Sequence, residues 1–141
     1  MSLRATFLGR LTILAFPCNQ FGEQEPGDRA QIQAFTQGMG VPSGDVDQGF
    51  VIMDKVDVNG PDTHPVFQYL KGSTPDASDI KWNFASYWLI SPSGVVQRLT
   101  GGRNGPATFA PQVDEVLAKE CANSSSTMQA SAAVVSACFS M

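Results

Sequence analysis

The sequence predicts one domain of the α/β class. Three runs rich in β-forming residues, at positions 11–16, 50–53 and 82–90, alternate with segments that carry helix-capping and helix-ending signals. The 141 residues are enough for one domain with one core. Strands that alternate with helices are typical of a sheet covered by helices, so the pattern alone supports the α/β class and nothing finer.

The first half of the chain predicts a strand, a helix and a second strand. Residues 11–16 form a short apolar run that a proline ends. A helix is expected over residues 28–38, capped by the aspartate at its start, with Ile32 and Phe35 on its buried side. A polar, glycine-rich stretch then separates this helix from the strand at residues 50–53.

The second half predicts a short helix, a hairpin and a last helix. The short helix starts at Asp62 or Thr63. Residues 82–90 are apolar on both faces, which is typical of a central strand that is covered on both sides. A tight turn joins this strand to a partner at residues 95–99, and the last helix is expected over residues 106–119.

Composition and charge exclude several classes of protein. The chain has 43% hydrophobic and 16% charged residues, as an ordinary globular protein does. A net charge of −4 and a pI near 4.7 give no electrostatic reason to expect nucleic acid as a partner. No apolar run approaches the roughly 20 residues that span a bilayer, so stable membrane insertion is not expected. Three cysteines and one histidine, without a Cys-x-x-Cys pair, favour a reducing compartment and no metal site.

The loop after the first strand carries the most specific signal in the chain. Residues 16–26 read F-P-C-N-Q-F-G-E-Q-E-P, and ligands usually bind in loops at the carboxyl ends of such strands. This run resembles the F-P-C-N-Q-F-G-x-Q-E-P signature of the glutathione peroxidases, with every defined position filled. The similarity runs from about Leu11 to Val113. It includes two further blocks of the family, Asn59-Gly60 with His64-Pro65-Val66-Phe67, and the W-N-F motif at residues 82–84.

The resemblance implies a thioredoxin-like fold, with a central mixed sheet flanked by helices, here missing its first strand and first helix. We therefore expect an incomplete domain at residues 1–120, with an exposed sheet edge beside residues 11–16. Residues 121–141 are rich in serine and alanine, and we expect a disordered, low-complexity tail. Within it, residues 132–139 are expected to make no more than a weak apolar contact.

The resemblance also implies the site residues. In the family, a glutamine, a tryptophan and an asparagine surround the peroxidatic cysteine or selenocysteine, and the matching positions here are Gln24, Trp82 and Asn83. The two amides would donate hydrogen bonds to the chalcogen, and Trp82 would add an indole donor and an apolar lid. Each residue alone has an ordinary explanation, as a solvated loop residue, a core aromatic or a turn residue. Their coincidence on three positions of one family's site favours the catalytic interpretation.

Two neighbouring residues carry weaker signals. Lys81, beside Trp82, is typical of a solvated charge. The alternative is that Lys81 binds substrate by attracting the carboxylates of glutathione or a lipid head group. His64, which precedes Pro65, is interpreted as a structural residue at the start of a helix.

The chain contains no match to the N-V-A-S-x-(Cys or selenocysteine)-G turn in which the family carries its nucleophile. Cys18 belongs to the F-P-C-N-Q run, where the family's cysteine is not the peroxidatic one and is more typical of a packed, inert thiol. Cys121 and Cys138 lie in or near the tail. We therefore expect the peroxidatic residue to be absent from this chain, the protein to be longer at its N-terminus, and the fragment to be inactive on its own.

Two departures from the family pattern concern the reductant and the assembly. Members that are reduced by thioredoxin carry a resolving cysteine near Phe35, where this chain has none, and this favours glutathione or another small thiol. The short loop at residues 71–81 resembles that of monomeric members that reduce phospholipid hydroperoxides, so we expect a monomer. We expect a cytoplasmic location, with an organelle as the alternative.

The expected function is the antioxidant reduction of hydrogen peroxide and of organic or lipid hydroperoxides, with glutathione or another thiol as reductant and without a cofactor. One alternative is a non-catalytic, thioredoxin-like binding module derived from a peroxidase. A second alternative is a thiol peroxidase that uses Cys18.

Overall fold

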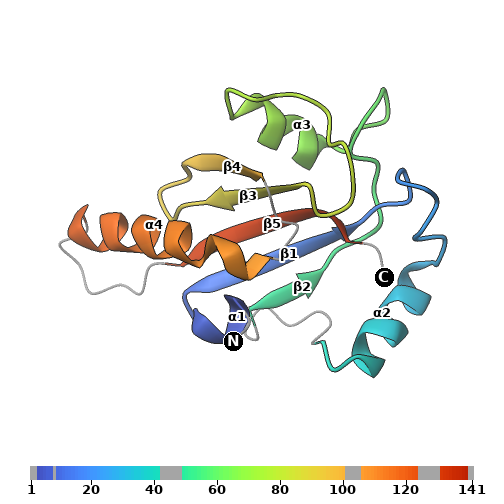
Figure 1. The fold of residues 1–141 in the computed structure, drawn as a ribbon, viewed down its shortest axis with the longest axis horizontal. Coiled ribbons are helices and arrows are strands. Elements are labelled where there is room, and N and C mark those ends of the chain that lie inside the picture. Colours follow the sequence, from blue (N-terminus) through green and yellow to red (C-terminus); the bar gives the residue numbers. More distant parts are fainter. Residues whose placement is uncertain (1–2, 8, 42–48, 101–105, 124–130, 140–141) are drawn as a thin grey trace.

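The computed structural model describes residues 3–7, 9–41, 49–100, 106–123 and 131–139, and it shows a mixed sheet flanked by helices (Figure 1). Five strands lie in the order β2-β1-β5-β3-β4. They are β1 (Leu11–Pro17), β2 (Phe50–Ile52), β3 (Ser86–Ile90), β4 (Val96–Thr100) and β5 (Ala132–Phe139). Strand β1 pairs in parallel with β2 and β5, and β3 pairs antiparallel with β5 and β4. The predicted α/β fold with a central mixed sheet and flanking helices is confirmed.

The described helices are α1 (Leu3–Thr6), α2 (Arg29–Gly38), α3 (Pro65–Gly72) and α4 (Ala110–Asn123), the last preceded by a 3-10 turn at Pro106–Phe109. Helix α2 begins as predicted, because the Asp28 carboxylate accepts from the backbone N of Gln31 while the Gln31 side chain accepts from the backbone N of Asp28. Within the described residues, no helix has the length and apolarity that crossing a bilayer requires.

The sheet buries a separate apolar cluster on each face. Along β3, Tyr87 and Leu89 pack with the buried side of α4, whereas Trp88 packs with α3 on the other face. This division follows from the alternation of side chains along a strand. Strand β5 contributes to both clusters, through Val134 on the side of α4 and Val135 on the side of α3. Strand β3 is therefore covered on both sides, as predicted. The prediction that this strand starts at residue 82 is wrong, because residues 82–85 form a turn in which Phe84 has a left-handed backbone with φ of 58°.

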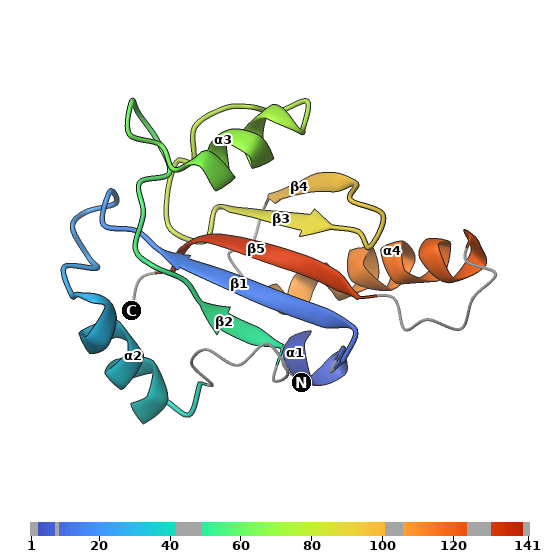
Figure 2. The same cartoon turned by 180° about the vertical axis from the view of Figure 1, so that it is seen from behind.

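Helix α2 lies off the sheet, beside the carboxyl end of β1 and at the opposite end of the molecule from α4 (Figures 1 and 2). Ile32 and Thr36 are its buried residues. The prediction that Phe35 is also buried is wrong, because its side chain is 51% exposed. A helix that touches its neighbours only along one edge buries a narrower stripe than one packed on a sheet face.

The prediction for the C-terminal tail is wrong at residues 132–139. These residues form β5, which pairs with β1 from Leu11 opposite Ala132 to Pro17 opposite Phe139. Residues 121–123 also belong to α4, while residues 124–130 lie outside the described residues. The sequence misleads because the apolar run is short and flanked by serines, and its partner strand is more than a hundred residues away.

The expected exposed edge beside the first strand is likewise absent from the described sheet. Strand β1 has β2 on one side and β5 on the other, and the outer strands are β2 and β4. The backbone of β1 thus pairs with β5 from Leu11 to Pro17 and with β2 from Ile13 to Ala15.

Candidate functional site

The loop after β1 turns sharply back on itself. Gly22 and Glu23 both have a left-handed backbone, with φ of 65° and 52°. Glycine adopts this conformation readily, whereas it is uncommon for a residue such as Glu23. Asn19 supports the turn, because its Oδ1 accepts a hydrogen bond from the backbone N of Glu25 at 2.9 Å. The turn brings Gln24 to the segment that precedes β3.

Gln24 and Asn83 are hydrogen-bonded to each other. Asn83 Nδ2 donates to Gln24 Oε1 at 2.9 Å, although the two residues are 59 positions apart in the chain. Gln24 is exposed, whereas Asn83 is only 8% exposed. The bond leaves Gln24 Nε2 as a donor, and Asn83 Oδ1 has no partner among the described residues. The pair therefore presents the Gln24 amide as a donor at the surface, while the Asn83 acceptor stays buried.

Trp82 lies over the same loop. Its side chain is 51% exposed, and its ring meets the ring of Phe21 edge-on with centroids 6.0 Å apart. A Cβ placed on Gly22 would lie 3.5 Å from the Cη2 atom of Trp82, so the indole packs closely against the turn. The structure thus gathers the three predicted site residues where the loop after β1 meets the segment before β3. Their catalytic roles stay a prediction.

A buried arginine anchors the segment before β3. Arg98 on β4 donates from Nη1 to the backbone oxygens of Asp76 and Ser78 at 3.0 and 2.7 Å, and from Nη2 to Ser86 Oγ at 3.0 Å. Its guanidinium also lies over the ring of Trp88, 5.1 Å from the centroid. Hydrogen bonds from the side chain and backbone of Ser78 lower the pKa of Asp76 below its usual value of 3.8. The carboxylate therefore stays charged beside Arg98 in mild acid.

Cys18 is packed in the core. It is 1% exposed and belongs to the apolar cluster on the side of α3, and its Sγ accepts from the backbone N of Gln20 at 3.4 Å. The prediction of a packed thiol is confirmed.

The other two cysteines lie in different places. Cys121 is exposed on α4. Cys138 lies in β5, where the register pairs Phe16 with Ala137 and Pro17 with Phe139. The backbone of Cys138 therefore lies at the end of the sheet where β1 runs into the loop that carries Gln24.

The two weaker signals have different outcomes. His64 caps α3 through Nδ1, which accepts from the backbone N of Val66 at 3.3 Å, and this confirms the structural interpretation. Helix α3 therefore begins at Pro65, slightly later than the sequence predicts. Lys81 is exposed beside Trp82, and its proposed attraction for substrate carboxylates stays a prediction.

Three polar side chains that shape the loop escaped the sequence analysis as site residues, namely Gln20, Lys55 and Asn59. Lys55 Nζ donates to the backbone oxygens of Glu25, Pro26 and Gly27 at 3.1, 3.3 and 2.7 Å, and so holds the end of the loop. No local pattern marks such a contact, because lysine and carbonyls are about thirty positions apart. Gln20 lies in the F-P-C-N-Q run and Asn59 in the Asn59-Gly60 block. Their place in these family motifs was the one sequence signal that could have marked them as site residues.

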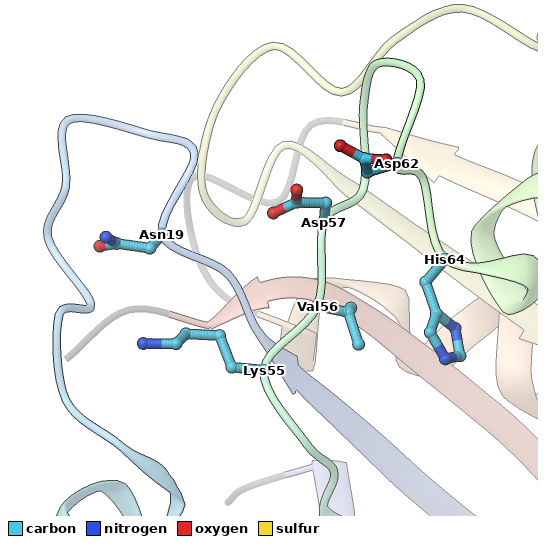
Figure 3. A pocket seen from close by; sticks show the side chains of 6 residues that line it. All are labelled: Asn19, Lys55, Val56, Asp57, Asp62 and His64. Atoms are coloured by element: carbon cyan, nitrogen blue, oxygen red, sulfur yellow. The ribbon is translucent and has the colours of Figure 1, made fainter.

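An open hollow of about 360 Å³ lies beside the loop, between residues that follow β1 and the connection from β2 to α3 (Figure 3). It is lined by Asn19, Lys55, Val56, Asp57, Asp62 and His64. Lys55 and the Nδ1 atom of His64 are already engaged with backbone groups. The hollow is therefore a feature of the loop's framework, adjacent to Asn19 rather than to the amide pair.

Comparisons with known proteins identify relatives of this chain. A family model described as glutathione peroxidase matches residues 2–71. "Glutathione peroxidase 1, mitochondrial" of Chlamydomonas reinhardtii is 43% identical over 118 residues, which cover 80% of this chain and 56% of the relative. "Hydroperoxy fatty acid reductase gpx1" of Synechocystis sp. is 37% identical over 115 residues, which cover 75% of this chain and 63% of the relative. The chain belongs to the glutathione peroxidase family.

The chain matches only part of the length of these relatives. The chain spans between half and two thirds of the two relatives named above. The crystal structure "Trgpx in apo form" aligns over 79% of this chain and 83% of that chain, at 23% identity and a TM-score of 0.43.

Proposed function

We propose that this glutathione peroxidase family protein reduces hydroperoxides with a thiol as reductant, and that Gln24, Asn83 and Trp82 hold the reacting chalcogen. The observation that carries the proposal is the hydrogen bond between Asn83 and Gln24, which joins two family motifs at one place. Neutral amide and indole groups suit this role, because they stabilise an anion without competing as acids.

The reaction consumes one hydroperoxide and two thiols. A thiolate or selenolate attacks one peroxide oxygen, the new bond to oxygen forms as the O–O bond breaks, and the alkoxide leaves as an alcohol after taking a proton. The resulting sulfenic or selenenic acid condenses with one thiol and releases water. A second thiol then attacks the sulfur of the first, which forms the product disulfide and releases the thiolate or selenolate of the protein. The Nε2 donor of Gln24 would stabilise the chalcogen anion, and Asn83 would hold Gln24 in place through the 2.9 Å hydrogen bond between them.

The substrate class in the proposal includes organic and lipid hydroperoxides as well as hydrogen peroxide. The side chain of Trp82 is half exposed and is backed by Phe21, so it offers an apolar surface to an alkyl chain beside the amide pair. The Synechocystis relative is named a hydroperoxy fatty acid reductase, which supports the same class of substrate. Glutathione is the proposed reductant, because the helix α2 carries no cysteine that could act as a resolving thiol.

We further propose that the nucleophile is supplied from outside these 141 residues, so that the chain alone is inactive. The test is a chimera in which a strand, turn and helix carrying N-V-A-S-x-Cys-G precede the chain. Both neighbours of β1 are occupied, by β2 and β5, so the chimera omits residues 132–141 to free a position in the sheet. Turnover is measured from NADPH oxidation coupled to glutathione reductase, with hydrogen peroxide and with a fatty acid hydroperoxide.

The chimera should turn over both substrates, and Gln24→Ala or Asn83→Ala should each lower kcat about a hundredfold. The matched control is Gln68→Ala, which removes a side-chain amide bonded to the backbone oxygen of Thr63 away from the site. A folded chimera without turnover would refute the peroxidase function and favour the binding module. Turnover by the 141-residue chain alone would refute an external nucleophile, and loss of that turnover in Cys18→Ser or Cys138→Ser would identify the thiol.

A further inference from the structure

Gln20 acts as a clamp on a distant backbone turn. Its Oε1 atom accepts hydrogen bonds from the backbone N atoms of Val58 and Asn59 at 2.8 and 3.0 Å. Its Nε2 atom donates to the backbone oxygen of Asn59 at 2.9 Å. One side-chain amide thus satisfies three backbone groups, as a neighbouring strand would.

Asn59 repeats this arrangement on the next segment. Its Nδ2 atom donates to the backbone oxygen of Ile80 at 2.7 Å, and its Oδ1 atom accepts from the backbone N of Ile80 at 2.9 Å. The same Oδ1 accepts from Lys71 Nζ at 3.0 Å, and Lys71 also pairs with Asp79 at 3.0 Å. Lys71 is only 9% exposed, so Asn59 Oδ1 bonds to an ammonium group that is itself largely buried.

The two clamps close a ring of contacts around the site. The ring runs from Gln20 to Asn59, from Asn59 to Ile80, along the chain to Asn83, and back to Gln24 through the 2.9 Å hydrogen bond. Ile80 is 2% exposed and lies two residues before Trp82, so fixing its backbone fixes how the chain enters the site. The clamps add to the contacts that the amide pair and Trp82 make between the loop after β1 and the segment before β3.

We propose that Asn59, supported by Gln20, is a positioning residue that holds Asn83 against Gln24 by clamping the backbone of Ile80. The inference rests on the proposed function only in taking the amide pair as the reacting part of the site. Its test is structural and uses the 141-residue chain itself. Failure of the peroxidase proposal and failure of the clamp proposal are therefore separate results.

The test measures hydrogen exchange and chemical shifts of the Asn83 and Gln24 side-chain amides by NMR. Asn59→Ala removes the clamp without touching the pair, and the exchange rate of the Asn83 amide protons should rise about tenfold. Gln24→Ala removes the oxygen that accepts from Asn83, so it sets the upper limit of the rise in the Asn83 exchange rate. Gln68→Ala, which loses an amide-to-backbone bond of the same kind elsewhere, should leave the Asn83 signals within about twofold of wild type.

Asn59→Asp separates positioning from general destabilisation. Aspartate keeps the acceptor for Ile80 and Lys71 but replaces the donor by a second oxygen that faces the carbonyl oxygen of Ile80, so the Asn83 signals should lie between those of Asn59→Ala and wild type. If Asn59→Ala does not fold, the Asn59→Asp variant still tests whether Asn59 positions Asn83. Unchanged Asn83 and Gln24 signals in folded Asn59→Ala, or an Asn59→Asp variant as disturbed as Gln24→Ala, would overturn the proposal.

Discussion

Strand β5 should contribute strongly to stability, and two of its valines provide the measurement. Val134 and Val135 are each 1% exposed and pack on opposite faces of the sheet. Replacing valine by alanine removes apolar carbon worth about 1.6 kcal/mol of transfer free energy, and the cavity adds to the cost. We expect Val134→Ala and Val135→Ala each to lower the free energy of unfolding by about 2 kcal/mol.

The double variant sharpens this prediction. Because the two side chains belong to separate clusters, their effects should nearly add, to about 4 kcal/mol. That is a large part of the roughly 5–15 kcal/mol by which a domain is stable. Urea unfolding followed by far-UV circular dichroism gives the free energies, and an unchanged m value indicates that the unfolding transition still exposes the same surface.

Val95→Ala provides the matched control. Val95 is 57% exposed next to β4, so the same chemical change should alter the free energy of unfolding by less than about 0.5 kcal/mol. If both β5 variants fell within that range, residues 132–139 would not be a buried central strand. The tail prediction made from sequence would then be the better description.

Three further predictions concern a helix cap and two titrating groups. Asp28→Ala removes the acceptor for Gln31 at the start of α2, and thermal unfolding should show a loss of about 1 kcal/mol. Burial raises the pKa of Tyr87 above its usual 10.0. Above pH 10 the tyrosine therefore ionises more readily in the unfolded chain than in the folded one, and the free energy of unfolding should fall as pH rises. Urea titrations of Tyr87→Phe should not show this fall. Hydrogen bonds from Ser78 hold the pKa of Asp76 below 3.8, so its stabilising contribution is present above that pH and is lost as pH falls below it. Asp76→Asn should abolish this acid dependence, and an unchanged acid limb in the variant would argue against the assignment.

Much of the fold can be predicted from local signals. The capping aspartate of α2, the start of α3 and the turn between β3 and β4 depend on signals within a few residues, so sequence alone places them within three residues. The alternation of Tyr87, Trp88 and Leu89 likewise reports a strand that is covered on both sides.

Strand β5 could not be predicted in this way. Its residues carry no periodic pattern of sufficient length, and what makes them a strand is the pair of open edges on β1 and β3 that they fill. Such a partner is a property of the assembled sheet and leaves no mark on the neighbouring sequence. The exposure of Phe35 has the same origin, because it depends on where α2 lies.

The candidate site likewise has a part that the sequence predicts and a part that only the structure shows. Gln24, Trp82 and Asn83 can be named from motifs, and the structure adds that the two amides bond to each other. The contacts of Gln20 and Asn59 depend on residues 39 and 21 positions away, so only a three-dimensional model reveals them.

The position of β5 also determines when this protein can fold during synthesis. In the described sheet, β5 alone joins the β2–β1 pair to the β3–β4 pair. A ribosome that has not yet released residues 132–139 therefore carries two separate two-stranded pieces, each too small to be stable in water. The sheet closes only after those residues emerge, through pairings that span almost the whole chain, and such long-range closure is slow. Until then the unpaired edges of β1 and β3 are exposed, so any need for a chaperone should fall once residues 132–139 have emerged.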